Sequence, residues 1–170
     1  MKFKQHTLHL LVCSALAAQG VLAQDGFPKK PIRVVLPFAS GSGSDASLRY
    51  VTSKIGQATG WTFVVENKPG AGTLVGSEFA ARAPADGYTL LLGGTSNMAF
   101  NLGLYPKLPY DPVRDFTPVG LTVTWPYMLV ARKDLPQTSL TELIDFARKN
   151  PEKLTYASGG RGTGQHIVVA

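Results

Sequence analysis

The sequence predicts an α/β domain with a doubly wound parallel sheet. Apolar runs that suit buried strands recur at 30–38, 61–66 and 88–94. The first two are each followed by a glycine-containing loop and then by a segment with helical spacing of apolar residues. Two strand–loop–helix units that feed a third strand give this architecture, since such crossovers are right-handed. The 170 residues, 44% apolar and 16% charged, fit one or two small globular domains.

Residues 1–23 have the three-part pattern of a secretory signal peptide. Lys2 and Lys4 supply positive charge, and a mostly apolar stretch follows over 8–22. Val21 and Ala23 then place small residues at positions −3 and −1 of a cleavage site before Gln24. We therefore expect export, with a mature chain that begins at Gln24. The single cysteine, Cys13, lies inside this leader, so the mature chain would have neither a disulfide nor a thiol nucleophile.

The formal net charge is +6, and the basic residues are scattered along the chain. No run interleaves basic with aromatic residues, which argues against a nucleic-acid partner. A mild positive field favours encounters with anionic small molecules.

The first half is expected to alternate strands and helices in order. After the strand at 30–38, Ser44 or Asp45 can cap a helix that runs to Thr59 and stops at Gly60. A strand at 61–66 leads through the loop 67–72 to a helix at 73–82, a turn at 84–87 and the third strand at 88–94. The loops that follow strands one and three should then lie side by side at the carboxyl edge of the sheet and form a pocket.

The second half of the chain no longer alternates apolar strands with helices and begins with a proline-rich segment. Three prolines within 104–112 exclude regular helix or central strand, so this segment is interpreted as the crossing out of the first domain. Strands are expected at 119–124, 127–131 and 154–157. Ser139 and Glu142 form a capping box that opens a helix to Asn150. A third glycine loop at 158–164 precedes a helix that begins at Gln165.

The loops suggest binding of an anion by main-chain groups. Small residues let several backbone N–H groups approach an oxyanion without any cationic side chain. Catalytic patterns are missing: His166 is the only histidine outside the leader, and no serine stands in a G-x-S-x-G motif. No catalytic residue, metal site or cofactor is therefore assigned, and Asp45 is expected to cap its helix.

A dinucleotide-binding oxidoreductase is the alternative. Residues 41–46 satisfy G-x-G-x-x-A, and Glu66 ends the second strand where a ribose-binding acid belongs. Against this stand the charge of Asp45, which would repel a pyrophosphate, and the export signal, which removes the protein from the NAD pool.

Several motifs in order resemble one family, the Bug receptors of tripartite tricarboxylate transporters. They are Lys30-Pro31-Ile32-Arg33; Pro37-Phe38-Ala39 with Asp45; Val65-Glu66-Asn67-Lys68-Pro69-Gly70-Ala71-Gly72; Asp86-Gly87-Tyr88-Thr89-Leu90-Leu91; Leu108-Pro109-Tyr110-Asp111-Pro112 with Asp115-Phe116; and Tyr156-Ala157-Ser158-Gly159-Gly160 with His166.

This resemblance implies a periplasmic-binding-protein type II-like fold of two doubly wound lobes. The lobes would comprise 24–101 and 117–170, the second incomplete, with a crossover and hinge region at 102–116. Such a protein is a monomeric, non-enzymatic receptor that captures a di- or tricarboxylate or related acid and delivers it to membrane permease subunits. The resemblance places the ligand at Ser40, Gly41, Ser42, Gly43, Ser44, Asp45, Gly94, Thr95, Asn97, Ser158, Gly159, Gly160, Gly162 and Thr163.

The sequence departs from the family pattern in two ways, and each departure leads to an expectation about binding. Ser40-Gly41-Ser42 stands where the family usually has Pro-Gly-Gly, and the added hydroxyls could alter which solute fits. Family members are also about twice as long, so we expect a C-terminally truncated receptor that is poorly soluble or binds no ligand tightly. A truncated product without function is a further alternative.

Overall fold

The computed structural model describes residues 26–170. The signal-peptide prediction for 1–23 therefore lies outside the described residues. The helices and strands found among residues 26–170 lie within the unit Pro31–Ala170. In chain order they are β1 (Ile32–Leu36), α2 (Gly43–Thr59), β2 (Phe63–Asn67), the 3-10 turn η1 (Ala71–Thr73), α3 (Leu74–Ala81), β3 (Thr89–Leu91), the π-helical turn η2 (Ser96–Phe100), α4 (Asn101–Leu104), α5 (Leu140–Lys149) and α6 (Gly164–Val169).

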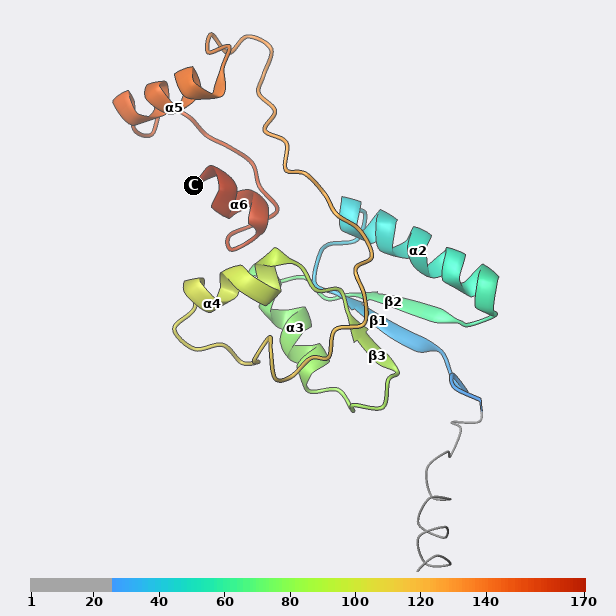
Figure 1. The fold of residues 1–170 in the computed structure, drawn as a ribbon. Helices are drawn as coiled ribbons and strands as arrows, with labels where there is room; N and C mark the ends of the chain where they lie inside the picture. The colour runs from blue at the N-terminus through green and yellow to red at the C-terminus, as the bar shows by residue number, and fades with distance from the viewer. Residues whose placement is uncertain (1–25) are drawn as a thin grey trace, which may run out of the picture. The chain divides into compact units, whose positions relative to one another are not determined.

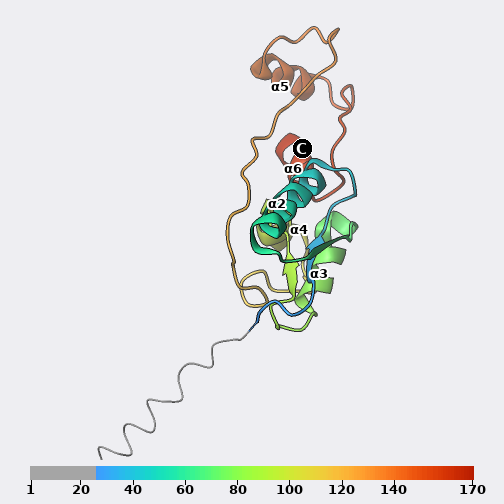
Figure 2. The same ribbon diagram turned by 90° about the vertical axis from the view of Figure 1, so that its right-hand side faces the viewer.

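The three strands form one parallel sheet in the order β2-β1-β3. Val34 at the centre of β1 lies opposite Val65 of β2 and Leu90 of β3. Figures 1 and 2 show α2 on one face of this sheet and α3 on the other. The predicted doubly wound arrangement is confirmed, because the chain winds first to one side of β1 and then to the other.

The core forms where β1 meets its two helices. Val34 and Leu36 pack with Leu48 of α2 on one face, and Val35, which points to the other face, is fully buried. On the α3 side, Gly76 lies so close to Pro37 that an added Cβ would stand 2.9 Å from the proline Cβ. Burial on both faces explains why β1 reads as an almost continuous apolar run.

The strands expected at 119–124, 127–131 and 154–157 are wrong, since none of these segments belongs to a strand. The apolar side chains of 119–124 and 127–131 lie exposed, with Val119 at 84% and Leu121 at 87% of full accessibility, and Leu154 is half-buried. An apolar alternating sequence becomes a strand only when a neighbouring segment satisfies its N–H and C=O groups. Among residues 26–170, no segment pairs with them.

The helix predicted after Ser139 forms as α5. Ser139 accepts a hydrogen bond from the Glu142 N–H at 3.2 Å, as a capping box requires. The Glu142 carboxylate accepts bonds from the N–H and hydroxyl of Thr138, which holds its pKa below the usual range. No helix in the described part of the chain is both long and apolar enough to cross a membrane.

Candidate functional site

The fourteen expected ligand residues fall in three loops and in the first turns of the helices that follow two of them. Residues 40–45 end the loop after β1 and begin α2, residues 94–97 follow β3 and begin η2, and residues 158–163 precede α6. Because β1 and β3 are neighbours in the sheet, the first two loops leave it at the same carboxyl edge. This is the topological switch point, where open α/β sheets bind ligands.

The first loop turns sharply into α2. Gly41 has φ +79°, a left-handed conformation that residues with a Cβ rarely adopt, and the helix begins two residues later. The Ser42 hydroxyl accepts a hydrogen bond from the Asp45 N–H at 3.3 Å, so Ser42 is the N-cap. The expectation that Ser44 or Asp45 caps the helix is wrong, because the helix begins earlier than the apolar spacing indicated.

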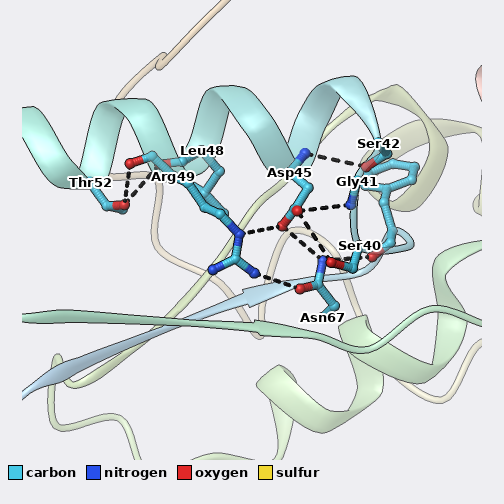
Figure 3. A network of polar contacts seen from close by, with 9 residues as sticks. Ser40, Gly41, Ser42, Asp45, Leu48, Arg49, Thr52 and Asn67 are labelled. Atoms are coloured by element: carbon cyan, nitrogen blue, oxygen red, sulfur yellow. Dashed lines mark hydrogen bonds and ion pairs between the residues drawn. The ribbon is translucent and has the colours of Figure 1, made fainter.

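Asp45 points inward, as Figure 3 shows, and is only 5% exposed. Its Oδ2 accepts the Gly41 N–H at 2.9 Å, and its Oδ1 accepts Asn67 Nδ2 and Arg49 Nε, both at 3.0 Å. These hydrogen bonds and the Arg49 charge, with the Gly41 N–H contributing most, hold the pKa of Asp45 below its usual range. The carboxylate is therefore ionised and turned to the protein rather than to solvent.

Arg49 and Asn67 complete a ring of hydrogen bonds with Asp45. Arg49 Nη2 donates to Asn67 Oδ1 at 2.9 Å, and Asn67 Nδ2 also donates to the Phe38 carbonyl at 3.1 Å. The ring joins α2, the end of β2 and the loop after β1. Sequence reasoning missed Arg49 and Asn67 as site residues; the i, i+4 spacing of Asp45 and Arg49 was the available signal.

Two N–H groups at the start of α2 have no intrahelical acceptor. Gly43 and Ser44 occupy the first helical turn, whose N–H groups cannot bond within the helix. Gly43 is exposed and Ser44 is half-buried. They are the remaining main-chain donors here, since the N–H groups of Gly41 and Asp45 are engaged within the protein.

In the loop after β3, a buried side chain again accepts a hydrogen bond from a glycine N–H of the loop, but the side chain is an amide rather than a carboxylate. Asn97 is fully buried, and its Oδ1 accepts the Gly94 N–H at 2.8 Å. Its Nδ2 donates to Ser77 Oγ of α3 at 3.1 Å and lies 3.4 Å from the Leu92 carbonyl. Asn97 therefore shapes the loop from inside, while Thr95 stays exposed.

Buried polar side chains connect this loop to the proline-rich segment 104–112. The Tyr110 hydroxyl donates to the Asn97 carbonyl at 2.7 Å and accepts from Asn101 Nδ2 at 3.1 Å. Tyr110 is 5% exposed and Asn101 is fully buried. The proline-rich segment is thus bonded directly to the loop after β3.

The third loop is also held internally. The N–H and hydroxyl of Thr163 both donate to the Gly160 carbonyl, at 3.1 and 2.7 Å, and Thr163 is 3% exposed. The Gly160 N–H donates to Ser158 Oγ at 3.3 Å. The Gly164 N–H donates to Ser96 Oγ at 3.0 Å, which brings the third loop against the loop after β3.

Two of the three loops are therefore brought together. Within residues 26–170, no direct hydrogen bond joins 40–45 to 158–163. Hollows of about 370 and 410 Å³ lie elsewhere, one beside α5 and one beside α3. Among residues 26–170, no group of three or more His, Cys, Asp or Glu side chains could hold a metal ion.

Glu66, the acid that the dinucleotide alternative requires, is engaged by neighbouring cations. Its carboxylate lies 2.9 Å from Arg33 Nε and 3.6 Å from Lys68 Nζ. A ribose hydroxyl would have to compete with both ion pairs. The structure thus offers no observation in favour of that alternative.

Comparison with known proteins identifies relatives over most of the chain. The family described as tripartite tricarboxylate transporter family receptor matches residues 48–170. The UPF0065 protein in the tcbD-tcbE intergenic region of a Pseudomonas species is 38% identical over 161 residues, which cover 94% of this chain and 48% of that protein. The chain spans about half the length of the curated relatives it matches.

Solved structures of similar proteins also match most of this chain and about half of their own length. The periplasmic binding protein BugD is 34% identical, with a TM-score of 0.68 over 83% of this chain and 47% of that one. A protein of R. palustris with adipate is 32% identical, with a TM-score of 0.67 over 81% and 46% of the two chains. MatC from Rhodopseudomonas palustris with bound malate is 36% identical, with a TM-score of 0.67 over 72% and 42%.

Proposed function

The chain belongs to the tripartite tricarboxylate transporter receptor family, and from this premise we propose that it serves as a periplasmic receptor for a small dicarboxylate. The receptor would act without chemical conversion of the solute and would pass it to the membrane subunits of a transporter. The observation that carries the ligand class is that two structural relatives hold adipate and malate, both of which are dicarboxylic acids.

The free donors of the first loop support this proposal. A carboxylate needs hydrogen-bond donors and a positive potential, and the first turn of a 17-residue helix supplies both. We assign ligand contact to the N–H groups of Gly43 and Ser44 and to the Ser44 hydroxyl. The Ser40 hydroxyl instead donates to Asp45 Oδ2 at 3.5 Å. Asp45, in contrast, would contact the loop rather than the solute.

The remaining parts of the assignment follow from the loop positions. Thr95 and residues 158–160 would face the solute from the other loops. The lobe boundaries at 24–101, 102–116 and 117–170, the monomeric state and delivery to a permease remain predictions of the family resemblance.

Calorimetry and thermal unfolding with a panel of acids test the function. This proposal departs from the expectation that the truncated chain binds no ligand tightly, and one experiment tests both. The 170-residue chain is titrated with adipate, malate and citrate, with dimethyl adipate as the uncharged control and NAD for the oxidoreductase alternative, and a shift with an acid would refute the earlier expectation. A dicarboxylate at a hundred times its Kd should stabilise the fold by about 2.7 kcal/mol, whereas the diester should give no shift.

The competing outcomes are distinct. Stabilisation by NAD alone would favour the oxidoreductase. A chain that folds cooperatively and responds to no acid in the panel would contradict the proposal. The Gly43→Pro variant removes one of the two free N–H groups at the first helical position, where helices tolerate proline and where the preceding Ser42 is already extended. It should weaken dicarboxylate binding while the helix remains.

A further inference from the structure

We propose that Asp45, together with Arg49 and Asn67, is a positioning residue that fixes the shape of the loop 40–44 before any solute arrives. The inference rests on the proposed function for the identity of the solute. It differs from the expectation that Asp45 contacts the ligand. Figure 3 shows the hydrogen bonds on which it depends.

The ring holds the loop at two points. Asn67 Nδ2 holds the Phe38 carbonyl at 3.1 Å, and Asp45 Oδ2 holds the Gly41 N–H at 2.9 Å. Directly after the second point, Gly41 turns the chain with φ +79°. Gly43 and Ser44 lie between Gly41 and Asp45, which the 2.9 Å bond joins, so this bond determines where their N–H groups stand.

Ligand contact is a poor role for Asp45. The residue is 5% exposed, and its two oxygens already accept well-aligned bonds from Gly41, Arg49 and Asn67. An unpaired carboxylate beside the site would also repel an acid. Arg49 Nε lies 3.0 Å from Oδ1 and offsets that charge.

Helix capping does not account for Asp45 either. Its own N–H is accepted by Ser42, which is the N-cap. The Asp45 side chain reaches one residue further back, to Gly41, and sideways to the end of β2 through Asn67. A carboxylate that served only the helix would have no need of Asn67.

Nuclear magnetic resonance of the Gly41 amide tests the role without any ligand. In the 170-residue chain, the Gly41 N–H should be protected from hydrogen exchange, and its proton shift should titrate with the Asp45 carboxylate. Arg49 is the charged group facing Asp45, and the Gly41, Ser40 and Asn67 partners are neutral. Asp45→Asn should abolish the titration and speed exchange.

Binding of adipate and malate supplies the second readout. Loss of a hydrogen bond to a charged group corresponds to roughly 10- to 100-fold in affinity. We expect such a loss for Asp45→Asn and for Asn67→Ala, and a smaller one for Arg49→Lys, which keeps the charge but not the planar fork. Glu78→Gln is the matched control, because it also breaks an i, i+4 pair with an arginine, on α3.

The outcomes separate this inference from the proposed function. If Asp45→Asn does not fold, Arg49→Lys and Asn67→Ala carry the test, since far-UV circular dichroism verifies their folding independently. A Gly41 amide that exchanges equally fast in the wild type and in these variants overturns the positioning role, as does unchanged affinity despite an altered loop. A wild-type chain that binds neither acid contradicts the proposed function, and the Gly41 readout then decides the positioning role alone.

Discussion

Replacing Gly76 by alanine should destabilise the protein, although alanine is the better helix former. Gly76 lies inside α3, where the intrinsic preference favours alanine by about 1 kcal/mol. A Cβ at this position, however, would stand 2.8 Å from the Lys68 carbonyl oxygen, 2.9 Å from Pro37 Cβ and 3.0 Å from Pro37 Cα. Two of these three atoms are main chain, so they cannot move aside by a rotamer change.

The steric effect should exceed the helix preference. Overpacking a well-filled site costs about 1–3 kcal/mol, and rigid neighbours place Gly76 in the upper part of that range. After the gain in helix preference is subtracted, we expect a net loss of about 1–2 kcal/mol. For a chain of this size the corresponding fall in melting temperature is about 2–8 °C.

Urea unfolding followed by far-UV circular dichroism measures the difference. Gly103→Ala is the matched control, because Gly103 also lies in a helix and an added Cβ would meet nothing within 4 Å. This control should be as stable as the wild type or slightly more so. If Gly76→Ala proves equal to Gly103→Ala, the close approach of α3 to Pro37 is refuted.

Three further predictions concern caps, buried hydroxyls and pH. Ser42→Ala removes the N-cap of α2 and should lower the unfolding free energy by about 1 kcal/mol, measured by urea titration; no change would contradict the cap. Tyr110→Phe leaves the Asn97 carbonyl without its 2.7 Å donor and should cost about 1–3 kcal/mol by thermal unfolding, whereas a neutral result would show that water replaces the hydroxyl. The pKa of Asp45 is lowered on folding, so its charge stabilises the fold above the ordinary carboxyl pKa of about 4, and this contribution is lost as pH falls from there through the lowered value. Urea midpoints between about pH 2 and 6 should fall less steeply for Asp45→Asn than for the wild type, and parallel curves would contradict this.

The sheet and its helices could be predicted because their signals are local. Apolar runs such as 30–38 specify a buried strand, and Gly60 specifies where α2 ends, without reference to distant residues. The strand order β2-β1-β3 follows from right-handed crossovers together with the placement of α2 and α3 on opposite faces of the sheet. The segments 119–124 and 127–131 carried an equally clear pattern but no information about a pairing partner, and pairing is what a strand requires.

The candidate site was predictable in position but not in detail. Glycine loops at strand ends indicated where donors gather. The direction of a side chain within such a loop depends on contacts with residues far along the chain, as Asn67 contacts Asp45 from 22 positions away. The one local signal was the i, i+4 spacing of Asp45 and Arg49. This spacing indicated an ion pair between them but not its part in holding the loop.

The internal bonds of Gly41 with Asp45 and of Gly94 with Asn97 have a consequence for entropy. Ordering the backbone of one residue costs about 1–2 kcal/mol, so a loop of six residues that ordered only on binding would lose roughly 6–12 kcal/mol. A micromolar complex forms with only about 8 kcal/mol in total. On the proposed positioning role, the loops order as the protein folds, so the core rather than the solute would bear that cost. Even a small acid with few contacts would then retain most of its interaction energy as affinity.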